Sequence, residues 1–175
     1  MSDDTAPPPK SGDGNPIIRP QRIDRKLRAT IIHEAGHVLA CLVLRVKFVG
    51  ADIRADNGSL GRVEVDFAAV PIDKQIIILM AGSAAERIMM PRGRTVADWG
   101  SSRNDVDEST ALVAALNPDW SEYQTTSYLA TMRRRAESII RLHRATLLVI
   151  AERLSERGKI GNGDVAELWK GDDGG

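Results

Sequence analysis

Two histidines and a glutamate near the N-terminus have the residue types and the spacing of a catalytic metal site. His33, Glu34 and His37 form a His-Glu-x-x-His motif in a segment with helical periodicity. Positions four apart on a helix lie only about 40° from each other, so both imidazoles can reach one ion. Glu34 follows the first histidine and is close enough to take a proton from a water on the metal. The motif therefore predicts a zinc site with Glu34 as the general base of a metallopeptidase.

The residues around the motif indicate that it is buried. Two apolar stripes at helical spacing flank it, formed by Leu27, Ile31, Ala35, Val38 and Leu42 and by Ile32, Leu39 and Val43. The alternative interpretation is that His33 and His37 are ordinary core histidines and that the motif is a coincidence. Because an unpaired buried charge is costly, ionisable groups in such a helix need partners. A metal ion supplies that partner, and the context favours zinc.

The composition is that of one soluble domain. The 175 residues are 42% hydrophobic, and 24 basic residues balance 24 acidic residues, which gives no general attraction to nucleic acid or to anionic membranes. We expect a disordered leader over 1–20, rich in Pro, Asp, Gly and Ser, a peptidase domain over 21–170 and a disordered tail over 171–175. With no long apolar run and a single cysteine, Cys41, we expect a cytoplasmic protein without membrane insertion or internal disulfides.

Periodicity and turn residues predict a mainly α (α+β) fold, in which a helical bundle carries a small β-hairpin beside the His-Glu-x-x-His helix. In the N-terminal half we predict a helix capped by Asp24 and running to about Val46, strands at 46–54 and 62–67 joined by a turn at 56–59, and a helix after Pro71 from Ile72 to about Met90. A loop follows over 91–100, and the next helix starts near 102–105 and ends before Asn117. Residues 121–157 are predicted to be helical with one break, Gly158 ends this region, and Asp164 caps a short final helix.

Two histidines make only half of a catalytic zinc site, which needs three protein ligands and one open position. Cysteine is excluded by count and position. The remaining candidates for the third ligand are His143, Glu86, Asp98 and Asp105. Spacing alone does not choose among these four.

Three motifs, in order, resemble the peptidase domain of the FtsH-type ATP-dependent zinc proteases. They are His-Glu-Ala-Gly-His at 33–37, Ala-Gly-Ser-Ala-Ala-Glu at 81–86 and Gly-Ser-Ser-Arg-Asn-Asp at 100–105. In that family the first motif is followed by a hairpin, a Gly-Gly-Arg-x-Ala-Glu-Glu helix and a Gly-Ala-Ser-Asn-Asp helix start. The resemblance covers roughly residues 24 to 170. It implies a zincin-like metallopeptidase domain that binds Zn²⁺ through His33, His37 and Asp105.

The resemblance also gives Asp105 and Glu86 specific roles. Ser102-x-x-Asp105 is a capping-box pattern, and without the resemblance we would favour a capping role for Asp105; with it we favour the third zinc ligand. A glutamate near a helix end is ordinarily solvated, but Glu86 could orient a ligand histidine from the second shell.

The chain also departs from the family. Ala81-Gly82-Ser83 replaces Gly-Gly-Arg, and Glu86-Arg87 replaces Glu-Glu. The chain has no Gly-x-x-x-x-Gly-Lys-Ser/Thr loop and no transmembrane segment, so we expect no ATPase activity from it. The hexamer of the family does not follow for this chain.

Two functions of different classes are consistent with these residues. The first is a zinc-dependent metalloendopeptidase that hydrolyses peptides or unfolded polypeptides, with an extended substrate added along the strand at 62–67. A variant of it is a processing peptidase for one regulatory protein. The second is a non-catalytic zinc-binding interaction or regulatory module that docks on a separate AAA ATPase in trans or on another partner. An intact Glu34 favours the first.

Overall fold

The computed structural model describes residues 24–54, 61–90 and 101–169. Within these ranges the chain is mainly helical with a small three-stranded antiparallel sheet, which confirms the predicted mainly α class. The predicted leader over 1–20, the turn at 56–59, the loop over 91–100 and the tail over 171–175 lie outside the described residues. In chain order the elements are α1 (Arg25–Val43), β1 (Phe48–Asp52), β2 (Arg62–Val65), α2 (Ile72–Met89), α3 (Ser101–Leu116), α4 (Glu122–Leu142), α5 (Arg144–Arg157), β3 (Lys159–Gly161) and α6 (Asn162–Trp169).

Helix α1 is the central element of the core. Every residue from Ala29 to Cys41 is buried, as the two apolar stripes predicted. Asp24 caps the helix, since its side chain accepts the N–H of Lys26. The helix ends at Val43, earlier than predicted, because Arg45 takes a left-handed conformation and the N–H of residue 46 donates to the carbonyl of residue 41.

Helices α1 and α2 pack at very short range. A Cβ placed on Gly36 of α1 would lie 2.6 Å from the carbonyl oxygen of Ala81 and 2.8 Å from the Cβ of Ala85, both on α2. Only glycine allows the two backbones to approach this closely. The contact brings the middle of α2 against the side of α1 that carries His33 and His37.

The sheet has the strand order β2-β1-β3, with both pairs antiparallel. The pairing of β1 with β2 confirms the predicted hairpin, although the strands are shorter than predicted. Strand β3 was not predicted, and its Ile160 pairs with Ala51 of β1. Strand β2 is therefore an edge strand of this sheet.

The C-terminal half confirms the predicted break and corrects one cap. The helical segment divides at His143 into α4 and α5, and Gly158 ends α5 with a φ of 71°. Asp164 was predicted to be the N-cap of the last helix, and this is wrong because α6 begins at Asn162. Asp164 lies in the first turn, where its carboxylate accepts the N–H of Gly161, as the acidic member of a capping box does.

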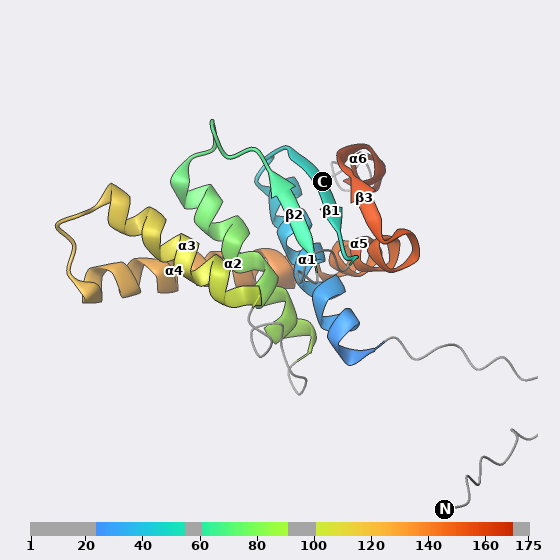
Figure 1. Cartoon of the computed structure of the whole chain (residues 1–175), viewed down its shortest axis with the longest axis horizontal. Helices are drawn as coiled ribbons and strands as arrows, with labels where there is room; N and C mark the ends of the chain where they lie inside the picture. The colour runs from blue at the N-terminus through green and yellow to red at the C-terminus, as the bar shows by residue number, and fades with distance from the viewer. Residues whose placement is uncertain (1–23, 55–60, 91–100, 170–175) are drawn as a thin grey trace, which may run out of the picture.

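Figure 1 shows α3 and α4 at one end of the molecule and the sheet with α6 at the other, with α1 and α2 between them. The strongest helix contacts join α1 to α2, α2 to α4 and α1 to α5. Cys41 is fully buried in this core. Among the described helices, none combines the length and the hydropathy that crossing a bilayer requires.

Candidate metal centre

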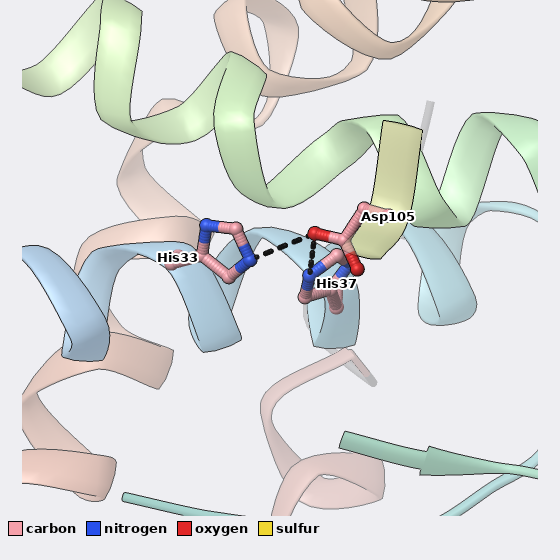
Figure 2. A group of neighbouring side chains, drawn as sticks. All are labelled: His33, His37 and Asp105. Carbon is pink, nitrogen blue, oxygen red and sulfur yellow. Dashed lines mark hydrogen bonds and ion pairs between the residues drawn. The ribbon is translucent and has the colours of Figure 1, made fainter. Parts of the chain in front are cut away.

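Three side chains, two from α1 and one from α3, converge beside α2. His33 and His37 project from successive turns of α1, and Asp105 reaches them from α3 (Figure 2). The Oδ2 atom of Asp105 lies 3.1 Å from Nε2 of His33 and 3.6 Å from Nε2 of His37. Ligands of a tetrahedral zinc ion lie about 3.3 Å apart, given Zn–N and Zn–O distances near 2.0 Å. All three donor atoms lie within 4.8 Å of one another, and the two distances from Asp105 are close to this ligand separation.

The opposite nitrogen of each imidazole is held by helix α2. Nδ1 of His33 lies 2.5 Å from Oε1 of Glu86, and Nδ1 of His37 lies 2.7 Å from the carbonyl oxygen of Ile78. Metal-binding histidines ordinarily make this kind of contact, donating the other ring N–H to a carboxylate or a backbone carbonyl. The contacts turn both Nε2 atoms toward Asp105.

The contact with Ile78 determines which nitrogen of His37 carries a proton. A backbone carbonyl only accepts hydrogen bonds, so Nδ1 of His37 must be the donor. Nε2 of His37 is then the nitrogen left to face Asp105, whose Oδ2 atom lies 3.6 Å away, beyond hydrogen-bond range. A cation held between these two atoms would be bound by both.

Electrostatics around the site favour a charged His33. Burial alone lowers the pKa of His33, but the hydrogen bonds with Asp105 and Glu86 and the nearby carboxylates outweigh it and raise the pKa to about 10. Burial opposes ionisation of Asp105 as well, yet its contacts with the two imidazoles hold its pKa well below the usual range. In the metal-free protein, His33 and Asp105 thus form an ion pair that a metal ion would replace.

Glu34 lies beside the three candidate ligands and lines the same cleft. Its side chain is largely buried, and burial raises its pKa above the ordinary value despite the nearby imidazoles. The cleft, of about 530 Å³, runs between this site and the edge strand β2. Its walls include Glu34 and Asp105 on one side and Val63 and Val65 of β2 on the other. A carboxylate with a raised pKa in such a cleft is suited to both accepting and returning a proton.

The structure distinguishes among the four candidates for the third metal ligand that sequence spacing left open. Asp105 lies inside α3, which begins at Ser101, so its position does not match the acidic residue of a capping box. His143 lies at the junction of α4 and α5, and Asp98 lies outside the described residues. Among the described residues, the group of three that could hold a metal is His33, His37 and Asp105.

Glu86 is fully buried in α2, and its carboxylate contacts Nδ1 of His33, where it can orient this ring as the sequence suggested. The sequence analysis did not predict two contacts of the site. One is the carbonyl of Ile78 against His37. The other is the close approach of Gly61 to Glu34, where a Cβ added to Gly61 would lie 2.6 Å from Oε1 of Glu34. A backbone carbonyl has no sequence signature. A single glycine in the sequence does not reveal which side chain lies against it.

Comparison with models of known protein families and with curated protein sequences finds no match for this chain. The function assigned to this site therefore depends on the geometry and chemistry of the described residues. Their donor set of two imidazoles and one carboxylate is typical of catalytic zinc ions that keep one position open.

Proposed function

We propose that this chain is a zinc-dependent metalloendopeptidase of zincin-like type, related to the peptidase domain of the FtsH-type proteases. In this proposal His33, His37 and Asp105 hold Zn²⁺, and Glu34 is the catalytic base. The observation that carries it is the arrangement of the two imidazoles, with Nδ1 atoms held by α2 and Nε2 atoms turned toward the Asp105 carboxylate.

The residues present fit a zinc ion by the chemistry of the donor set. Imidazole nitrogen and carboxylate oxygen are ordinary zinc ligands, and three of them leave one position for a water or a substrate. The buried carboxylate of Glu86 behind His33 adds the outer hydrogen bond that such ligands require. When bound there, zinc would supply Lewis-acid chemistry, acidifying water and polarising the substrate carbonyl.

Glu34 performs the proton transfers. Its carboxylate takes a proton from the attacking water as the new C–O bond forms, and it passes this proton to the nitrogen of the leaving amine as the C–N bond breaks. Burial favours the protonated form that Glu34 adopts between these two steps. The base is therefore suited to both accepting and donating a proton.

The edge strand β2 offers a place for an extended substrate. It pairs with β1 on one side, and its residues from Arg62 to Val65 line the cleft that contains Glu34. A peptide added along such an edge gains affinity from backbone hydrogen bonds, which require little sequence specificity. This favours unfolded polypeptides and peptides as substrates.

Zinc content and cleavage, measured together, test the proposal. We expect the wild type to hold roughly one equivalent of zinc, and Asp105→Ala to bind zinc roughly 10- to 100-fold more weakly or worse. Glu34→Gln should keep zinc and lose roughly 100-fold or more of the cleavage of an unfolded protein, because it removes the base and leaves the ligands. Equal cleavage by the wild type, Glu34→Gln and a chelated sample would contradict the enzymatic mechanism. Bound zinc without any cleavage would instead support the non-catalytic module.

A further inference from the structure

Helix α2 presents a row of three groups to the two histidines. Ile78, Gly82 and Glu86 are spaced four residues apart and therefore lie on one side of α2. The first contacts His37 through its carbonyl, and the last contacts His33 through its carboxylate. Gly82 lies between them, at the level of the nitrogens that face Asp105.

Gly82 approaches both imidazoles more closely than any side chain would allow. A Cβ at this position would lie 2.5 Å from Nε2 of His37 and 2.6 Å from Nε2 of His33. Cβ atoms essentially never lie this close to other heavy atoms, so the rings would have to move. Each ring is fixed at its other nitrogen, and movement would break the contact with Ile78 or with Glu86.

Close packing of helices does not account for this glycine. At Gly36, the atoms nearest to an added Cβ belong to the backbone of Ala81 and to Ala85, as expected where two helix backbones touch. At Gly82 the three nearest atoms all belong to the rings of His33 and His37. The space that Gly82 leaves open is thus used by the two imidazoles and not by a neighbouring helix backbone.

We propose that Gly82 is a positioning residue of the metal centre. Its missing side chain lets both imidazoles keep their Nε2 atoms directed at Asp105 while α2 holds their Nδ1 atoms. The inference rests on the proposed zinc site and extends it to the element behind the ligands. Gly82 does not touch substrate and takes no part in proton transfer.

Zinc affinity of the metal-free protein, measured by competition with a chromophoric chelator, tests this role. Gly82→Ala should bind zinc roughly 10- to 100-fold more weakly than the wild type, because the methyl group displaces both rings. Gly61→Ala is the matched control. Its methyl group would meet Glu34 and Thr30 in the same cleft, and neither imidazole is among its three nearest neighbours. It should bind zinc within about threefold of the wild type.

The possible outcomes separate this inference from the proposed function. Wild-type affinity in Gly82→Ala would overturn the role of Gly82 and leave the zinc site intact. A wild type that binds no zinc would instead overturn the proposed function. An equal loss of affinity in Gly61→Ala would show that any added methyl group disturbs the site, and would also overturn the inference.

A thermal double-mutant cycle covers the case in which Gly82→Ala alone does not fold. The substitution should lower the melting temperature of the metal-free wild type, because the methyl group meets two fixed rings. In a His33→Ala/His37→Ala background the rings are absent, and the same substitution should be neutral or stabilising, as Gly→Ala is within a helix. An equal loss of stability in both backgrounds would assign Gly82 to general packing and overturn the inference.

Discussion

His33 has an acidic partner at each ring nitrogen. Glu86 is at Nδ1 and Asp105 at Nε2, and with both nitrogens protonated the ring can donate to each carboxylate. This explains why the pKa of His33 rises to about 10 although burial opposes the charge. A metal ion at the site must displace the proton on Nε2, since a nitrogen that carries a proton cannot be a ligand.

Zinc binding should therefore release a proton even at mildly alkaline pH. An ordinary histidine with a pKa near 6.5 is neutral at pH 8 and has almost no proton to lose. His33 stays protonated at this pH because pH 8 lies below its raised pKa. Calorimetric titration with zinc at pH 8, in two buffers of different ionisation enthalpy, should show release of at least about one proton per ion.

Glu86→Gln provides the comparison for this measurement. The substitution keeps an oxygen at the same position and removes the carboxyl group whose hydrogen bond raises the pKa of His33. The number of protons released at pH 8 should fall in this variant. A wild type that binds zinc at pH 8 without releasing any proton would contradict the charge state that we assign to His33.

The individual residues of the site differ in how visible they are in the sequence. His33, Glu34 and His37 follow from helical periodicity, because four-residue spacing places side chains on one face. Asp105 lies 68 positions after His37 and 72 after His33, so only a family resemblance could select it.

The contribution of Ile78 was not predicted because it is made by the backbone and has no side-chain signature. In the sequence, Gly82 stood out only as a member of the motif at 81–86. A glycine in a helix ordinarily indicates close packing. The contact of Gly82 with two imidazole rings depends on how α1 and α2 pack against each other, which the sequence does not reveal.

At the scale of elements, the α1–α2 contact determines how the histidines meet their partners. Gly36→Ala should destabilise the protein, since its methyl group would lie 2.6 Å from a backbone oxygen that cannot move independently of α2. Overpacking of this kind costs about 1–3 kcal/mol. For a domain of this size we expect a melting temperature lower by roughly 2–12 °C.

Gly163→Ala in α6 is the matched control for this loss of stability. Apart from its chain neighbours and the nearby backbone of α6 itself, no heavy atom lies within 4 Å of the added methyl group, and alanine is the better helix former. Its melting temperature should stay unchanged or rise slightly, as circular dichroism can measure. Equal melting temperatures for Gly36→Ala and the wild type would show that α1 and α2 do not pack as closely as described.

The elements themselves could be predicted where their signal is local. The amphipathic periodicity of α1, α2, α4 and α5 and the alternation of β2 indicated each element within a few residues. Strand β3 has only three residues and pairs with a strand that lies more than a hundred residues earlier in the chain. Such a strand depends on tertiary pairing and leaves no pattern of its own.

At the scale of the whole molecule, the site exists only in the folded chain. α1, α2 and α3 contribute the candidate ligands and their supports, and β2 contributes the far wall of the cleft. Segments from residue 33 to residue 105 must come together before one ion can be held. A ligand that binds the folded state alone stabilises it, so zinc should act as a structural stabiliser of these helices as well as a catalyst.

In the proposed peptidase, the size of the cleft and its edge strand would limit which substrates can be cut. An added strand needs several residues of extended, unpaired backbone, which a compact folded protein does not offer. The sequence also lacks the Gly-x-x-x-x-Gly-Lys-Ser/Thr loop of an ATP-driven unfoldase. We therefore expect this chain to cleave a reduced, alkylated protein at least about 10-fold faster than the same protein in its folded, disulfide-bonded form.

Gel analysis of both forms at equal concentration measures this difference, with Glu34→Gln as the control for contaminating proteases. ATP should leave both rates unchanged. Equal cleavage of the folded form would contradict recognition through β2, because the folded protein offers no strand to add. If ATP accelerates cleavage only when a separate ATPase is present, unfolding and hydrolysis are divided between two proteins, and the cleft described here performs the second step alone.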